Sequence, residues 1–143
     1  MATAQQLIAD KGATVASLPP TATVLEAAQL MNDRHIGSVL VISHDRLVGI
    51  FTERDVMRRI VAEERSPATT TLDAVMTHQV ACAAPHTRLD EIRAVMRQKR
   101  IRHVPVADGR RVMGMISIGD LNKAEHDGQV ETIRYLEQYM SVT

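Results

Sequence analysis

Two short segments carry the same pair of chemical groups, a hydroxyl followed three residues later by a carboxylate. They are Thr52 with Asp55 and Ser117 with Asp120. In the simplest interpretation each pair is a helix-capping box, in which hydroxyl and carboxylate bind free backbone N–H groups at the start of a helix. The pattern alone therefore predicts two helix N-termini, and a binding role needs further support.

Three neighbouring features supply that support. A glycine, Gly49 or Gly114, precedes each hydroxyl by three residues near the end of an apolar run, where it permits close backbone approach. A helix N-terminus offers N–H groups and partial positive charge to a phosphate. A carboxylate one turn further only accepts hydrogen bonds, so it suits the vicinal hydroxyls of a ribose. Together these groups describe a ribonucleotide site, and their presence twice makes capping alone less persuasive.

Both segments belong to an internal repeat. Asp120 follows Asp55 by 65 positions, and the same offset relates further identical residues without a gap: Pro20 to Pro85, Glu26 to Glu91, Met31 to Met96, Ile36 to Ile101, Val39 to Val104 and Val41 to Val106. The chain is therefore two copies of one supersecondary unit. We expect a site where the copies face each other.

Apolar periodicity and turn residues predict the order strand-helix-strand-strand-helix in each copy. The expected elements of the first copy are 15–18, 23–34, 38–42, 47–51 and a helix from 52; those of the second are 80–83, 88–99, 104–107, 112–116 and a helix from 118. A short helix over 1–12 and an amphipathic helix over 129–140 flank them. Because three strands need a surface to cover one face, we predict an α/β (α+β) fold with the copies packed sheet to sheet.

Composition limits the class of protein. The 143 residues are 45% apolar, so both copies can share the core of one domain. No apolar run approaches the ~20 residues of a membrane span, and the first residues do not resemble a secretory signal. The single cysteine, Cys82, cannot form an internal disulfide and suits a reducing compartment. We therefore expect a cytoplasmic protein without a membrane partner.

Charge and side-chain types exclude other functions. Lys plus Arg and Asp plus Glu both total 17, and aromatic residues are 2%, so no nucleic-acid partner is expected. Eight basic residues against three acidic ones lie between Arg88 and Arg111. A solvated helix face explains most of these, and a local anion site the rest. The six histidines lack metal-ligand spacing, so no metal is expected.

The repeated segments resemble a known family. Paired Gly-x-x-[Ser/Thr]-x-x-Asp segments, each after a helix and a hairpin, are similar to a tandem cystathionine-β-synthase (CBS) domain pair, often called a Bateman module. The stretches 52–55 and 101–106 resemble those of stand-alone bacterial members, and the likeness covers roughly residues 5 to 123. It implies a pseudo-twofold module whose cleft binds an adenine nucleotide (AMP foremost, or ATP or NAD(H)). It also implies regulation without catalysis, and a homodimer.

The resemblance also implies roles for individual residues. Asp55 and Asp120 would each hold the ribose of one site, with Thr52 and Ser117 near phosphate or ribose. Arg54, Arg102 and His103 would hold phosphate, and Val80 and Cys82 would lie against adenine, with Val15 and Ser17 as looser counterparts. The complete set of nucleotide-binding residues implied is Thr52, Arg54, Asp55, Val80, Cys82, Arg102, His103, Pro105, Ser117, Ile118 and Asp120.

The expected organisation is an N-terminal helix (1–14), a first CBS repeat (15–62), a linker (63–71), a second CBS repeat (72–123) and a C-terminal helix (124–143). The copies differ, because Gly119 replaces Arg54 and Arg102-His103 replaces Gly37-Ser38. The half-sites are therefore unequal, and we expect the one at Ser117 and Asp120 to be tighter, because Arg102 and His103 belong to the same repeat and Arg54 is expected to reach it across the pseudo-twofold axis.

Three functions remain open at this stage. The first is a nucleotide sensor that regulates an unidentified protein. The second is a dimeric protein-interaction adaptor with a vestigial nucleotide site, and the third, an enzyme acting on nucleotide phosphates, is the weakest because no P-loop or paired carboxylates are visible. For the dimer, we expect apolar helix positions that one chain leaves uncovered, at Val56, Met57, Ile60 and Leu121.

Overall fold

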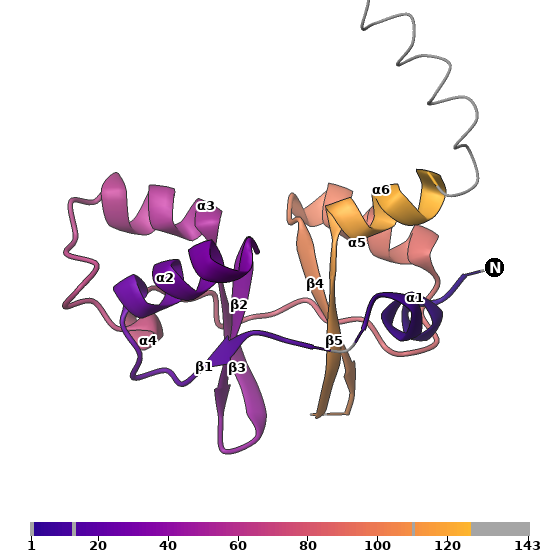
Figure 1. Cartoon of the computed structure of the whole chain (residues 1–143), viewed down its shortest axis with the longest axis horizontal. Coiled ribbons are helices and arrows are strands. Elements are labelled where there is room, and N and C mark those ends of the chain that lie inside the picture. Colours follow the sequence, from indigo (N-terminus) through magenta and orange to yellow (C-terminus); the bar gives the residue numbers. More distant parts are fainter. Residues whose placement is uncertain (1, 13, 110, 127–143) are drawn as a thin grey trace, which may run out of the picture.

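The computed structural model describes residues 2–12, 14–109 and 111–126, and Figure 1 shows two similar halves side by side. The first half contains β1 (Ser17–Leu18), α2 (Val24–Arg34), β2 (Ser38–Ser43), β3 (Arg46–Thr52), α3 (Glu53–Asp55) and a π-helix, η1 (Val56–Val61). The second contains α5 (Leu89–Lys99), β4 (His103–Asp108), β5 (Arg111–Ser117) and α6 (Ile118–His126). Two further helices are α1 (Ala4–Lys11) and α4 (Leu72–Val75). The expected mixed fold with two repeats is confirmed.

The offset of 65 residues extends to unusual backbone details. Helices α2 and α5 are each followed by a left-handed, non-glycine residue, His35 with φ 54° and Arg100 with φ 55°. Both hairpins shift their pairing at corresponding points, after Val41 in one and after Val106 in the other. The repeat of sequence is therefore a repeat of structure.

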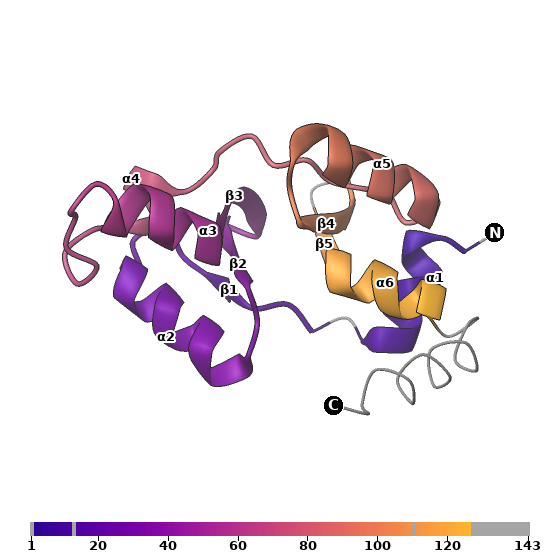
Figure 2. The same cartoon turned by 90° about the horizontal axis from the view of Figure 1, so that it is seen from above.

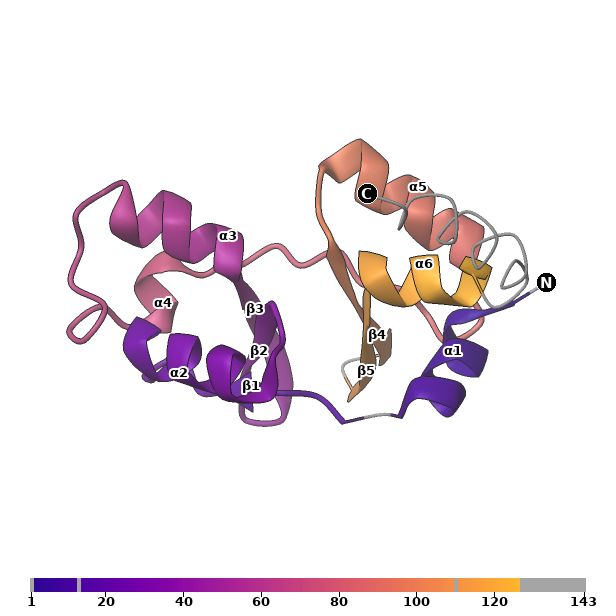
Figure 3. The same ribbon diagram turned by 45° about the horizontal axis from the view of Figure 1, so that its top comes forward.

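The strands form two sheets that face each other. In the first sheet β1 pairs parallel to β2, and β2 pairs antiparallel to β3. In the second, β4 and β5 form an antiparallel hairpin, which Ala83 extends by a parallel bridge to Val106. Strands β3 and β5 contact each other, and Figures 2 and 3 show the helices of each repeat on the outer side of its own sheet. The predicted packing of sheet to sheet is confirmed.

Each repeat has its own buried cluster. Phe51, Val39 and Val41 lie in the first cluster, and Val106 and Ile116 lie in the second, all fully buried. Burying one such side chain stabilises the fold by ~1.5–3 kcal/mol, so each sheet is fixed to its helices mainly by apolar packing. The strands that carry the hydroxyl–carboxylate pairs are thereby held from behind.

Each cluster also includes a helix that lies outside the repeat in sequence. Leu72 and Val75 of α4 pack in the first cluster, whereas Leu7 and Ile8 of α1 pack in the second. The expected boundaries at 15–62 and 72–123 follow the sequence repeat, and this packing crosses them. Consequently the segments that follow α1 and α4 run from one repeat to the other, as Figure 1 shows.

Backbone hydrogen bonds anchor α1 beside the start of α5. The N–H of Ala4 donates to the carbonyl of Thr87 at 2.8 Å, and the N–H of Leu89 donates to the carbonyl of Ala2 at 3.1 Å. These bonds lie on either side of an isolated antiparallel β-bridge between Thr3 and Arg88. The second repeat is therefore completed by a segment from the opposite end of the described chain.

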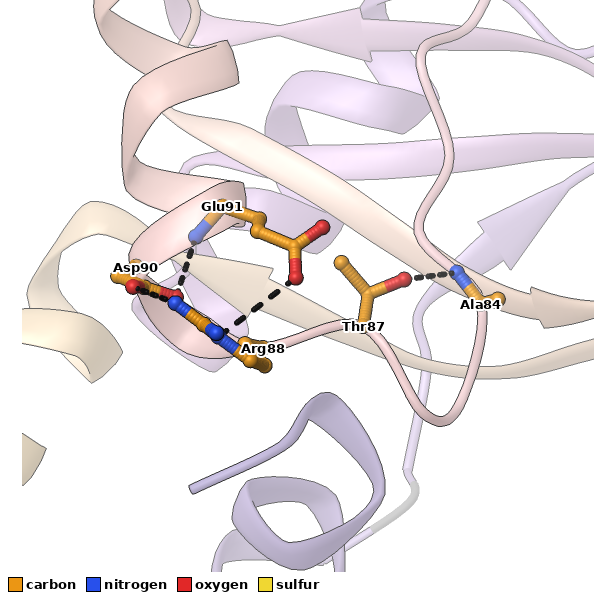
Figure 4. Close-up of polar contacts among 5 residues, drawn as sticks. All are labelled: Ala84, Thr87, Arg88, Asp90 and Glu91. Atoms are coloured by element: carbon orange, nitrogen blue, oxygen red, sulfur yellow. Dashed lines mark hydrogen bonds and ion pairs between the residues drawn. The ribbon is translucent and has the colours of Figure 1, made fainter. Parts of the chain in front are cut away.

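Figure 4 shows how the turn before α5 is stabilised. The hydroxyl of Thr87 accepts a hydrogen bond from the N–H of Ala84 at 3.0 Å. The guanidinium of Arg88 points towards the carboxylates of Asp90 and Glu91, with 3.0 Å between Arg88 Nε and Asp90 Oδ1. This part of the basic segment is thus a solvated, ion-paired helix start.

Two local predictions are wrong. Residues 80–83 form no strand, because this segment crosses between the repeats and only Ala83 reaches the second sheet. Ile60 and Leu121 are not uncovered, since each is 2% exposed within the cluster of its own repeat, whereas Met57 is 56% and Val61 68% exposed. The helix predicted over 129–140 lies outside the described residues. Within those residues, no helix combines the length and apolar character that crossing a membrane requires.

Candidate functional site

A cleft of about 590 Å³ lies between the two repeats. Three segments line it: the stretch from the end of β3 into η1, the segment that crosses between the repeats, and the corner between α5 and β4. Its volume is within the ~300–1,000 Å³ that small-molecule sites occupy. Both repeats are therefore needed to build this cavity.

The hydroxyl–carboxylate pair of the first repeat is part of the lining. Asp55 Oδ2 accepts the N–H of Thr52 at 3.0 Å, and Thr52 Oγ1 accepts the N–H of Asp55 at 3.3 Å. The helix-capping interpretation is thus confirmed. A carboxylate has about four acceptor positions, so capping does not exhaust Asp55. Its other oxygen, Oδ1, lies 3.6 Å from Nε of Arg59.

The wide turns of η1 follow this cap directly. Hydrogen bonds span five residues there, from the N–H of Ala62 to the carbonyl of Met57 and from Arg65 to Ile60, both 2.9 Å. Such π-helical turns occur frequently at functional sites. In this chain they place Met57 and Arg58 in the lining of the cleft.

The pair of the second repeat forms the same capping box and gains a further donor. Asp120 Oδ2 accepts the N–H of Ser117 at 2.8 Å and the Nζ of Lys11 at 2.7 Å. Burial alone would raise the pKa of Asp120, but the Lys11 ammonium and the Ser117 N–H outweigh it, so the pKa lies below its ordinary value. Neither Ser117 nor Asp120 lines the cleft described above.

Cationic side chains gather around the cleft. Five of its lining residues are basic and two are acidic; the basic ones are Arg54, Arg58, Lys99, Arg100 and Arg102. Arg54 also joins the repeats, because its Nη1 donates to the carbonyl of Arg100 at 3.0 Å. Clustered charge of one sign within a concave surface attracts ligands of the opposite sign. An anionic ligand therefore suits this cavity.

His103 lies at the contact between the repeats. A Cβ added to Gly37 would be 3.3 Å from His103 Cε1 and 3.1 Å from Glu53 Oε1, so the missing side chain at Gly37 leaves space for both groups. Burial lowers the pKa of His103, and Arg102 acts in the same direction, against the opposite influence of Glu53 and Asp120. The imidazole is thus mostly neutral at pH 7 and can gain a proton when an anion approaches.

The structure brings six of the eleven expected residues together in the lining: Thr52, Arg54, Asp55, Val80, Arg102 and His103. The others lie elsewhere. Pro105 is fully buried in β4, Cys82 is exposed with Sγ 3.7 Å from the carbonyl of Val80, and the N–H of Ile118 donates to the carbonyl of Arg102 at 2.8 Å. Partial desolvation raises the pKa of the Cys82 thiol, which disfavours the nucleophilic thiolate.

Several lining residues were absent from the prediction, notably Thr77, Gln79 and Ala81 in the crossing segment and Arg58 in η1. Arg58 lies one helical turn after Arg54, so helical spacing could have identified it. In the crossing segment, the predicted role of Val80 was the available signal, because residues next to it in the chain lie near the same cavity. Among the described residues, no group of three or more His, Cys, Asp or Glu side chains is placed to hold a metal ion.

Comparison with known proteins agrees with this geometry. The family model of the CBS domain matches residues 13–62 and 72–127. The mitochondrial CBS domain-containing protein CBSX3 of Arabidopsis thaliana is 32% identical over 123 residues, which cover 82% of this chain and 60% of that protein. The chain thus spans about three fifths of the length of this relative.

Solved structures show the same architecture. A protein with CBS domains from Burkholderia ambifaria MC40-6 is 41% identical, with a TM-score of 0.80 and coverage of 85% of this chain and 90% of that one. The CBS domain pair of protein MJ0100, in complex with 5′-methylthioadenosine and S-adenosyl-L-methionine, has a TM-score of 0.80 and covers 90% of this chain and 98% of that one. Its identity is 22%, so this likeness concerns the fold alone. With one family match on each of two structurally equivalent repeats, the chain belongs to the CBS domain family and contains a tandem pair of these domains.

Proposed function

We propose that this chain is a regulatory module that binds an adenine nucleotide in the cleft beside Thr52 and Asp55. The observation that carries the proposal is the convergence, in one cavity built by both repeats, of a carboxylate at a helix start and five cationic side chains. AMP, ATP and NAD(H) are the candidate ligands. Each combines a ribose, which a carboxylate can bind, with phosphate, which the cations can bind.

Individual residues would divide the ligand between them. Asp55 would accept hydrogen bonds from the ribose hydroxyls, and Arg54, Arg102 and His103 would hold phosphate. The side chains of Val80 and Ile50 would contact the base. A neutral His103 would become protonated beside a phosphate, because a nearby negative charge raises the pKa of an imidazole.

Regulation follows from where the ligand would lie. A nucleotide in contact with both repeats favours the arrangement of repeats that binds it more tightly, and a ligand can shift an equilibrium only by such a difference in affinity. We propose no catalysis by the module itself, so the signal passes to an unidentified partner protein. A cytoplasmic location is part of this proposal, because one free cysteine suits a reducing compartment.

Calorimetry of Asp55→Asn tests the nucleotide site. An amide binds two hydroxyls less well than a carboxylate, so the affinity for AMP, ATP or NADH should fall about ten- to a hundred-fold, or ~1.5–3 kcal/mol. Asp120→Asn is the matched control, since it alters the equivalent capping box of the second repeat, outside this cleft, and should leave the affinity unchanged. Unchanged affinity in Asp55→Asn, with the fold intact by circular dichroism, would reduce Asp55 to a capping residue.

The alternative function is a dimeric adaptor with a vestigial site. One observation favours a dimer: Met57 and Val61 of η1 expose 56% and 68% of their surface. Exposed apolar side chains on one helix are typical of an interface, and a twofold dimer would cover both copies at once. Failure of every adenine nucleotide to raise the melting temperature at millimolar concentration would favour the adaptor, since a ligand that binds only the folded state must stabilise it.

A further inference from the structure

The two half-sites differ where each crossing segment begins. Helices α1 and α4 dock equivalently at an offset of 68 residues, since the N–H of Ala4 donates to the carbonyl of Thr87 as the N–H of Leu72 does to that of Ala22. Ile8 and Met76, also 68 residues apart, accordingly pack against the equivalent glycines Gly114 and Gly49. Lys11, at the end of α1, then corresponds to Gln79, which lines the cleft. A neutral amide in one repeat thus corresponds to an ammonium group in the other.

The contacts of the neighbouring strand differ as well. In the first repeat, the carbonyl of Ile50 in β3 accepts the backbone N–H of Thr77 at 3.0 Å. In the second, the counterpart of Ile50 is Met115, whose carbonyl accepts Lys11 Nζ at 2.7 Å. The same ammonium donates to Asp120 at 2.7 Å, in a pair whose side chains are only 34% and 24% exposed. Lys11 therefore links α1 both to β5 and to Asp120, the carboxylate of the second half-site.

A ribose must displace the donor that already occupies the carboxylate, so binding depends on which donor this is in each half-site. A ribose diol needs both oxygens of a carboxylate. At Asp55, the additional donor to Oδ2 is the Thr52 hydroxyl at 3.2 Å, which can rotate away at small cost. Arg59 Nε lies 3.6 Å from the other oxygen, Oδ1, which is longer than a hydrogen bond, and its side chain is 44% exposed. At Asp120 it is the Lys11 ammonium, and its displacement breaks a charge-assisted hydrogen bond and the bond to Met115 together.

We propose that Lys11 determines which half-site accepts nucleotide, by closing the one at Asp120 and leaving the one at Asp55 open. This inference rests on the proposed function, and it reverses the order of affinity that the sequence suggested. It assigns the N-terminal helix a role in ligand selection: a nucleotide binds at Asp120 only when Lys11 is displaced. The wild-type chain then binds one nucleotide where its repeat symmetry offers two half-sites.

Substitution of Lys11 by an uncharged side chain of similar length tests this inference. Lys11→Met removes the ammonium while Leu7 and Ile8 keep α1 in its core. Titration calorimetry with ATP, and separately with AMP and NADH, should give one site per chain for wild type and two for Lys11→Met. Lys11→Gln serves as a second variant, and Lys11→Arg, which keeps the charge, should retain one site.

Double variants identify the new site. Lys11→Met with Asp120→Asn should return to one site, and Lys11→Met with Asp55→Asn should keep one site, now at Asp120. Two sites in wild type, or one site in both folded neutral variants, would overturn the inference. Weaker binding in Lys11→Met would also overturn it, because Lys11 would then be a ligand group.

These outcomes are separable from failure of the proposed function. If wild type binds none of the three nucleotides, the proposed site at Asp55 is wrong. Binding gained by Lys11→Met and abolished by Asp120→Asn would still support the role of Lys11. No binding by Lys11→Met in that case would overturn this role as well.

Discussion

Helix α4 passes so close to strand β3 that residue 49 has no room for a side chain, and one added methyl group tests this packing. In Gly49→Ala the new Cβ would lie 2.5 Å from Met76 Sδ and 3.0 Å from the backbone oxygen of Thr77. Gly114→Ala is the matched variant in the second repeat. There the Cβ would lie 2.6 Å from Cδ1 and 3.0 Å from Cγ1 of Ile8, which are side-chain atoms.

The two variants should therefore differ in stability. Overpacking costs ~1–3 kcal/mol, and replacing glycine by alanine within a strand regains about 0.5–1 kcal/mol. At Gly49 the oxygen of Thr77 is held by the N–H of Ile50 at 3.0 Å, so backbone must move and we expect a net loss of ~1–2 kcal/mol. At Gly114 the Ile8 side chain can change rotamer, and the expected loss is below ~1 kcal/mol.

Urea unfolding of wild type, Gly49→Ala and Gly114→Ala measures this difference. The slope of the unfolding free energy against urea concentration should be equal in all three proteins. A thermal scan should show a shift of about 3 °C for each kcal/mol in a chain of this size. Gly49→Ala should also weaken nucleotide binding, because the displaced Thr77 lines the cleft. If Gly49→Ala matches wild type, or if Gly114→Ala loses more stability, the described contact between α4 and β3 is wrong.

Two further predictions concern pH and assembly. Burial lowers the pKa of His103 in the folded chain, so as the pH falls below about 6.5 the imidazole is protonated first in the unfolded chain. The stability that depends on neutral His103 is therefore present above that pH and is lost as the pH falls through the pKa of the folded state. His103→Gln should therefore reduce the loss of unfolding free energy between about pH 6.5 and 5, and an unaltered pH dependence would contradict the assignment. Val61→Asp, on a side chain that is 68% exposed, should convert a dimer to a monomer in light scattering without loss of stability, and a monomeric wild type would refute the dimer. Ile60→Asp should instead unfold the first repeat, because its unpaired charge would be buried.

Local signals predicted much of the fold. Thr23 caps α2 as expected, its hydroxyl accepting the N–H of Glu26 at 3.1 Å, because a capping residue acts on its own helix. Helix α4 was missed, since four residues are too few to show periodicity. The strand predicted over 80–83 is wrong because this short apolar run crosses between the sheets and pairs only at Ala83. Composition reports propensity, whereas strand pairing depends on distant residues.

The candidate site divides in the same way. The family resemblance placed both Asp55 and His103 at nucleotide sites, but it assigned His103 to the half-site of its own repeat, with Asp120, whereas His103 lines the cleft of Asp55. The contact between Lys11 and Asp120 spans 109 positions, and the equivalent position in the first repeat holds Gln79, so the repeat pattern could not predict it. Ile60 was assigned to an exposed face because helical spacing identifies an apolar side without saying what covers it.

The exchange of α1 and α4 between the repeats has a consequence during synthesis on the ribosome. The first repeat can close its core once Met76 has left the exit tunnel, because α4 directly follows the strands that it covers. Helix α1 is made earliest of the described elements, yet Leu7 and Ile8 pack with residues from Ala83 to Leu121, which emerge much later. The nascent chain must therefore carry the apolar face of α1 without its partners through most of translation. A chaperone that binds such helices would meet this protein at its N-terminal segment and release it when α6 appears.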